Sequence, residues 1–144
     1  MTYPIEYYSV INVINEDFRD PCKKTVYFVG IHHKEGLSAL DSSTRGGKLI
    51  DRVIERLPAD YLAAKTNLFR MFNMPGPKRA EMMAKEWVRF WDPQEGDAIV
   101  LLGDEVQKWF PETPGVQIIN SKHPAACWSK SSQQEFIDNI INKL

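Results

Sequence analysis

The chain has 144 residues, 43% hydrophobic and 26% charged, which is typical of one globular domain that builds its own core. Its formal net charge of −1 argues against a protein that coats DNA non-specifically, because such a protein would be more basic. A local basic patch that binds nucleic acid remains compatible with that charge. An apolar run long enough for a transmembrane helix and a signal-peptide pattern are both absent, so we expect a cytoplasmic protein with no membrane partner.

The first half of the chain alternates between strand and helix patterns. Residues 7–14 are rich in aromatic and β-branched side chains, and we leave open whether residues 1–23 add an edge strand or form an extension. Residues 25–31 are nearly all apolar, which predicts a strand buried on both faces. A polar loop over 32–47 precedes residues 48–57, whose apolar side chains recur at helical spacing.

The second half continues the same alternation. Residues 62–69 contain a strand that ends near Asn67, and the apolar run 98–102 predicts another buried strand. The remaining predicted elements are helices over 78–91, 104–110 and 133–144 and a last strand over 116–119. We therefore predict an α/β fold, a three-layer α/β/α sandwich in which a single domain, residues 1–144, has a central, mainly parallel four-stranded sheet.

Polar residues follow the predicted strands at their carboxyl ends, where ligands of parallel sheets bind. Asn67 carries an amide that both donates and accepts hydrogen bonds, which suits the edge of a nucleobase, although a strand-ending Asn often bonds its own backbone. Pro124 restricts His123 to an extended conformation, and an imidazole held in this way can donate to a developing oxyanion. An ordinary surface histidine is the alternative interpretation.

The segment 42–48, Ser-Ser-Thr-Arg-Gly-Gly-Lys, runs into the N-terminus of a predicted helix. Its glycines and the helix dipole favour a bound anion there, and hydroxyl capping of the helix explains the same residues equally well. The segment is not a Walker A loop, because Ser42 stands where that pattern has its first glycine and Leu49 follows Lys48.

The histidines and cysteines do not form a clear metal-binding pattern. His32 and His33 follow the first buried strand directly, so extended geometry would direct their side chains to opposite faces. A metal shared by His32 and His123 would need a third ligand that is not evident, and we expect no metal site. Cys22 and Cys127 are too few for an iron–sulfur cluster.

Trp128 differs from the other tryptophans, which fall on or beside predicted helices and are interpreted as packing residues. It lies between Lys122 and Lys130 in the loop after the last predicted strand. An exposed aromatic ring flanked by lysines is a candidate for stacking on, or wedging between, nucleic-acid bases. The tryptophans assigned to packing are Trp87, Trp91 and Trp109.

Five segments, in order along the chain, resemble the uracil-DNA glycosylase superfamily, most closely its compact bacterial and phage members and its thermophilic iron–sulfur branch. The segments are VYFVGIHHKEG (26–36), STRGGKLID (43–51), KTNLF (65–69), AIVLLGDEV (98–106) and KHPAA (122–126). The resemblance covers residues 25–144. It implies a DNA-repair glycosylase that hydrolyses the N-glycosidic bond of uracil or another modified base, with a flipped base in DNA as its partner.

The resemblance also implies roles for individual residues. His32 would activate water, His123 would stabilise the departing base anion, and Trp128 with the loop before it would wedge into the duplex. The residues implied in base or nucleotide contact are Gly30, Ile31, His33, Ser42 and Asn67. The residues implied in phosphate or DNA contact are Ser43, Thr44, Arg45, Gly46, Gly47, Lys48, Lys122, Trp128 and Lys130.

Departures from the family pattern keep two further functions open. His32 and His33 stand where the family usually has Asp, Asn, Glu or Ala followed by Pro, and Ser42 replaces the aromatic residue that stacks on the base. The cluster cysteines are absent, so the resemblance implies no cofactor. The alternatives are a non-catalytic protein that binds a nucleotide or a nucleotide-derived signal, and an interaction module that keeps only the fold. The oligomeric state is left open.

Overall fold

The computed structural model describes residues 23–32 and 34–144, so His33, Cys22 and the strand expected over residues 7–14 lie outside the described residues. Strands and helices alternate through the part that is described. In chain order they are β1 (Lys24–His32), α1 (Arg45–Glu55), β2 (Tyr61–Phe69), α2 (Pro77–Trp91), β3 (Ala98–Leu102), α3 (Asp104–Trp109), β4 (Gln117–Ser121), the short 3₁₀ helix η3 (Pro124–Ala126) and α4 (Lys130–Ile141).

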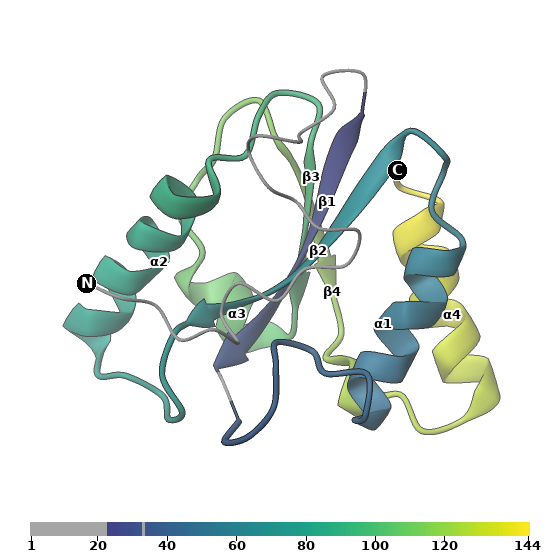
Figure 1. The fold of residues 1–144 in the computed structure, drawn as a ribbon, viewed down its shortest axis with the longest axis horizontal. Helices are drawn as coiled ribbons and strands as arrows, with labels where there is room; N and C mark the ends of the chain where they lie inside the picture. Colours follow the sequence, from purple (N-terminus) through teal and green to yellow (C-terminus); the bar gives the residue numbers. More distant parts are fainter. Residues whose placement is uncertain (1–22, 33) are drawn as a thin grey trace.

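The four described strands form one sheet in the order β2-β1-β3-β4, and every neighbouring pair is parallel. Helices α2 and α3 cover one face of this sheet, and α1 and α4 cover the other (Figure 1). The predicted three-layer α/β/α fold is therefore confirmed, with a sheet that is wholly parallel. Because all four strands run in the same direction, their carboxyl ends meet at one edge, which collects the loops that follow them.

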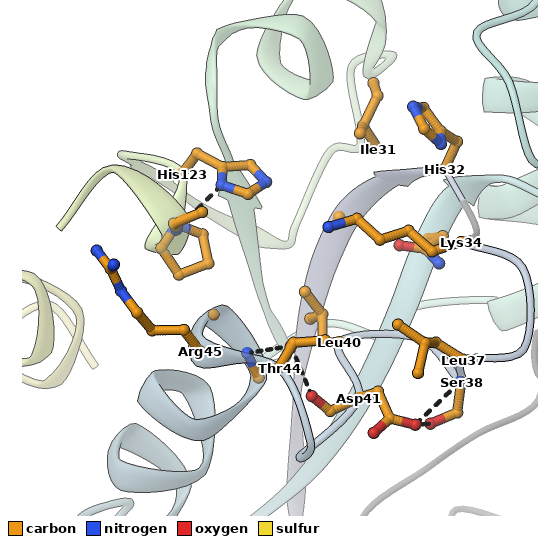
Figure 2. Close-up of a pocket in the computed structure, with 16 residues that line it drawn as sticks. Ile31, His32, Lys34, Leu37, Ser38, Leu40, Asp41, Thr44, Arg45 and His123 are labelled. Atoms are coloured by element: carbon orange, nitrogen blue, oxygen red, sulfur yellow. Dashed lines mark hydrogen bonds between the residues drawn. The ribbon is translucent and has the colours of Figure 1, made fainter. Parts of the chain in front are cut away.

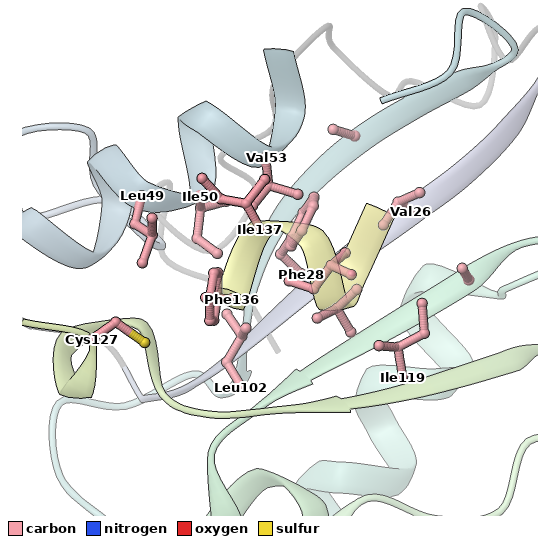
Figure 3. Close-up of a cluster of buried hydrophobic side chains, with 14 residues drawn as sticks. Val26, Phe28, Leu49, Ile50, Val53, Leu102, Ile119, Cys127, Phe136 and Ile137 are labelled. Carbon is pink, nitrogen blue, oxygen red and sulfur yellow. The ribbon is translucent and has the colours of Figure 1, made fainter. Parts of the chain in front are cut away.

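Side chains of β1 alternate between two hydrophobic cores. Tyr27 faces α2 and packs edge-on against Trp87, with ring centroids 5.6 Å apart. Phe28 faces the opposite way, toward the cluster between the sheet, α1 and α4 (Figure 3). Trp87 and Trp91 are buried and Trp109 packs against the same core, which confirms their interpretation as packing residues. In the part of the chain that is described, helices thus cover both faces of the sheet, and the ends of its strands are left for a site.

Two helices begin earlier than the apolar periodicity indicated, and side-chain caps explain both differences. Helix α1 starts at Arg45 because the Thr44 hydroxyl accepts a hydrogen bond from the backbone N–H of Gly47 at 3.0 Å. Helix α4 starts at Lys130 because Ser129 and Ser132 form a reciprocal capping box. Apolar spacing reports the buried face of a helix, whereas its first turn is decided by polar caps.

Candidate functional site

A cavity of about 280 Å³ opens at the carboxyl end of the sheet. Its walls come from the ends of β1 and β2, the loop before α1 with the first turn of that helix, and the loop after β4 (Figure 2). The residues singled out in the sequence that line it are Gly30, Ile31, His32, Thr44, Arg45, Gly46, Gly47, Asn67 and His123. The other lining residues are Lys34, Leu37, Ser38, Leu40, Asp41, Pro124 and Ala125.

Asn67 contributes a buried amide to the cavity wall. It lies beside Gly30, because the two residues are register partners in the parallel strands β1 and β2. A Cβ atom at Gly30 would lie 2.6 Å from Asn67 Oδ1, closer than side chains tolerate. Glycine at position 30 therefore makes room for the amide to lie across β1, and only 5% of Asn67 is exposed.

His123 reaches the cavity from the loop that follows β4. Its Nδ1 accepts a hydrogen bond from the backbone N–H of Ala125 at 3.1 Å, which fixes the ring (Figure 2). Partial burial of the ring, together with the positive charge of Lys34, lowers the pKa of His123 below its ordinary value. The neutral ring is therefore favoured at pH 7. With Nδ1 acting as an acceptor, the neutral ring must carry its proton on Nε2.

His32 ends β1 and lines the same cavity. In Figure 2 the Ile31 side chain lies between the ring of His32 and the ring of His123. Over residues 23–32 and 34–144, no group of three or more His, Cys, Asp or Glu side chains is close enough together to hold a metal ion. The two described histidines therefore line the same cavity without forming a metal site among the described residues.

The loop between β1 and α1 folds around the carboxylate of Asp41. Ser38 donates to Oδ2 through its backbone N–H at 3.1 Å and its hydroxyl at 2.8 Å, and the backbone N–H of Ser43 donates to Oδ1 at 2.8 Å. Hydrogen bonds from Ser43 and from Ser38 hold the pKa of Asp41 well below its ordinary range. A Cβ atom at Gly47 would overlap the Asp41 carbonyl group, so the close approach of α1 to this loop requires glycine.

Lys65 fastens the same loop to the sheet. Its side chain is 2% exposed, and Nζ donates to the carbonyl of Leu40 at 2.9 Å and pairs with the Asp51 carboxylate of α1 at 2.6 Å. Nζ also donates to the hydroxyl of Ser42 at 3.1 Å. Ser42 was expected to contact the base, but it is exposed and does not line the cavity, because its hydroxyl is turned toward this buried ammonium.

Leu40, and not Ser42, lines the cavity near Asn67. Its Cδ2 would lie 3.3 Å from a Cβ atom at Gly30, so the leucine covers the end of β1 next to the amide. The backbone of Leu40 has φ of 49°, an uncommon left-handed conformation for a branched side chain. The hydrogen bond from Lys65 to its carbonyl helps to hold that conformation.

The residues expected at phosphates divide into two groups. Thr44, Arg45, Gly46 and Gly47 line the cavity, but as the cap and first turn of α1 and not as an open glycine-rich loop, because Thr44 caps the helix ahead of both glycines. The others lie outside the main cavity with exposed side chains; they are Ser43, Lys48, Lys122, Trp128 and Lys130. Ser43 does not offer its backbone N–H to a ligand, since that group bonds Asp41.

Trp128 stands at the rim of the site and is 76% exposed. The guanidinium of Arg45 lies 3.6 Å from the centroid of its ring, which is stacking distance. Arg45 also donates from Nη2 to the carbonyl of Cys127 at 3.2 Å. The exposed ring is therefore supported on one face by a cation that itself lines the cavity.

Sequence reasoning missed the residues that shape the loop. Lys65 sits within an otherwise buried strand, and a lysine there was the one signal in the sequence for a buried ion pair. Asp41 follows Leu40 and precedes Ser42 and Ser43, so in the sequence it looks like any other polar loop residue. Its role depends on contacts that no periodicity encodes.

No protein-family model matches this sequence, and no curated protein matches it significantly. Among the helices of the described residues, none is both long and apolar enough to cross a membrane. The geometry of the cavity is therefore the basis for assigning a function.

Proposed function

We propose that the protein is a DNA glycosylase that takes a flipped uracil or another modified base into the main cavity and hydrolyses its N-glycosidic bond. One observation carries the proposal: the Asn67 amide and the His123 imidazole, 56 positions apart in sequence numbering, line the same cavity at the strand ends. A volume of about 280 Å³ lies near the lower limit of roughly 300–1,000 Å³ for small-molecule sites. It favours a single base over a larger ligand.

The amide and the imidazole suit the two ends of the reaction. Asn67 donates and accepts hydrogen bonds, as recognition of a pyrimidine edge requires. Cleavage of the bond between the sugar C1′ and the base leaves the bonding electron pair on the base, where it spreads onto a carbonyl oxygen. The Nε2–H of neutral His123 would donate to that oxygen, and loss of such a donor costs roughly 10²–10³ in rate.

Water completes the reaction by adding to C1′. His32 lies across the cavity from His123 and would orient this water and accept its proton as the carbon–oxygen bond forms. At the rim, Arg45 and the exposed ring of Trp128 would engage the strand from which the base has been flipped. Binding, charge stabilisation and water activation are thereby divided among separate side chains.

The proposal is tested by base release. We expect abasic sites when the protein is incubated with oligonucleotides that contain uracil or other altered bases, in single- and double-stranded form. His123→Ala and Asn67→Ala should each lower the rate by on the order of 100-fold. Asn139→Ala, at an exposed position of α4, is the matched control and should retain the full rate. Release that survives both cavity substitutions would reject the assignment.

One observation favours a second candidate, a nucleotide-binding protein that does not cleave. Among the described residues that line the main cavity, Asp41 is the one carboxylate, and three hydrogen bonds from Ser38 and Ser43 already engage it. It is therefore poorly placed to activate water. Absence of base release, combined with a rise in Tm when nucleotides are added, would support this candidate. Loss of that rise in Asn67→Ala would place the nucleotide in the same cavity.

A further inference from the structure

A smaller cavity of about 110 Å³ lies between α1 and the chain that leads into α4. It shares two wall residues, Arg45 and Pro124, with the main cavity. Its basic lining residues are Arg45, Lys48 and Arg52, which occupy positions i, i+3 and i+7 of α1 and therefore lie along one side of the helix. The remaining lining residues are Leu49, Cys127 and Gln133.

This arrangement of positive charge is unfavourable for α1 by itself. Arg45 and Lys48 lie at the start of the helix, where the helix dipole disfavours cations, and the first turn contains no acidic residue. Side chains three and four positions apart also face one another, so Lys48 experiences the charges of Arg45 and Arg52 together. Arg45 is held by Trp128, and Arg52 lies in the last turn, where the helix dipole favours a cation. Lys48, however, has no ion pair within the described residues, and a bound anion would offset the charge of all three.

The three side chains also retain most of their hydrogen-bonding capacity. Within the described residues, Arg45 donates once, to the Cys127 carbonyl, and Arg52 donates once, from Nη1 to Oε1 of Gln133 at 3.2 Å. A guanidinium has five N–H donors, so several remain for a ligand. Within residues 23–32 and 34–144, no carboxylate pairs with any of the three, and the ion pairs found there involve other cations.

We propose that the smaller cavity is an anion subsite, which holds a backbone phosphate of the nucleic-acid strand whose base enters the main cavity. The inference rests on the proposed function, which supplies the nucleic-acid strand as the source of the phosphate. Arginine matches the tetrahedral oxygens of phosphate through paired N–H donors, and lysine adds a point charge. Arg45 belongs to both cavities, and its stacking on Trp128 holds its guanidinium plane at the boundary between them. The base and a neighbouring phosphate would thus occupy two adjoining cavities that share Arg45 as a wall residue.

The test measures how salt weakens binding of an unmodified single-stranded oligonucleotide, a readout that requires no base release. Each phosphate that a protein neutralises adds about 0.7 to the slope of log K against log salt for a single strand. Arg52→Gln and Lys48→Gln should each reduce the slope by up to about 0.7 and weaken binding at low salt. Both positions are exposed, so Tm should be retained.

Arg56→Gln is the matched control, because it removes the same charge from the end of the same helix. Arg56 already pairs with Asp138 at 2.8 Å, and we expect its substitution to leave the slope unchanged. Equal slopes for wild type, Lys48→Gln and Arg52→Gln would overturn the subsite, even if the protein releases base. A slope that falls as expected without any base release would keep the subsite and reject the glycosylase.

Discussion

The two ends of the parallel sheet both contain buried polar groups, but they use them differently. At the amino end, the carboxylate of Asp97 accepts hydrogen bonds from the backbone N–H of Thr25 at 2.9 Å and of Gln94 at 2.8 Å. Asp97 is 5% exposed and ties the start of β3 to the start of β1. At the carboxyl end, Asn67 is equally buried, but it borders an open cavity of about 280 Å³.

The contrast shows that a buried polar residue does not by itself indicate function. Asp97 satisfies two backbone donors of its own chain and lies outside both described cavities, which is the pattern of a structural residue. Asn67 requires a glycine beside it and lines the main cavity. Substitutions at the two ends should therefore separate loss of stability from loss of binding.

The largest effect is expected at the amino end. Asp97→Ala leaves two backbone N–H groups without their acceptor and should lower the free energy of unfolding by about 3 kcal/mol. Chemical denaturation measures this loss, and ligand affinity of the protein that remains folded should be unchanged. Asp60→Ala is the matched control, because its side chain is exposed and makes no hydrogen bond within the described residues. Similar stability for both variants would contradict the structural role of Asp97.

Gly30→Ala should have a smaller effect on stability than Asp97→Ala, but it should weaken ligand binding, which Asp97→Ala should not. The added methyl group would displace the Asn67 amide, which is the end of a movable side chain, so we expect a stability loss of about 1 kcal/mol. Loss of the aligned amide should weaken ligand binding on the order of tenfold, measured by titration calorimetry. At Gly76, by contrast, a Cβ atom meets nothing within 4 Å, and Gly76→Ala should bind normally. Normal binding by Gly30→Ala would remove Asn67 from the site.

The same contrast explains how much could be predicted from the sequence. Continuous apolar runs predicted the bounds of β1 and β3 nearly to the residue. A strand that is buried on both faces must be apolar at almost every position, so its length can be read from the run. The parallel arrangement then placed Asn67 and His123 at one edge of the sheet. Such reasoning needs only the residues at which each strand ends. It therefore predicts where a site lies but not the contacts within it.

The inner structure of the loop before α1 could not be predicted in this way. Ser42 and Leu40 are two positions apart, and which of them lines the cavity depends on the left-handed backbone of Leu40 and on the buried ammonium of Lys65. Both depend on tertiary contacts between segments 23 or more positions apart. The family resemblance therefore pointed to Ser42, whereas the fold places the aliphatic Leu40 in the cavity wall.

The smallest expected effect is the pH dependence of His123. Burial of the ring, and then Lys34, lowers its pKa in the folded protein, whereas the unfolded chain has the ordinary value of about 6.5. Between these two values the unfolded chain binds a proton that the folded protein does not. The free energy of unfolding should therefore decrease as the pH falls through that window, and the neutral ring should persist below pH of about 6.5.

Titration of the His123 ring by NMR measures this directly, without any assumption about catalysis. The midpoint should lie below about 6.5 in the wild type. Lys34→Gln should raise it toward that value without reaching it, because the burial remains, and Lys85→Gln, at an exposed position of α2, should not change it. An ordinary midpoint in the wild type would mean that His123 behaves as a surface histidine. Burial and Lys34 would then have no effect on the ring, and the contrast between the two ends of the sheet would depend on Asn67 and the cavity alone.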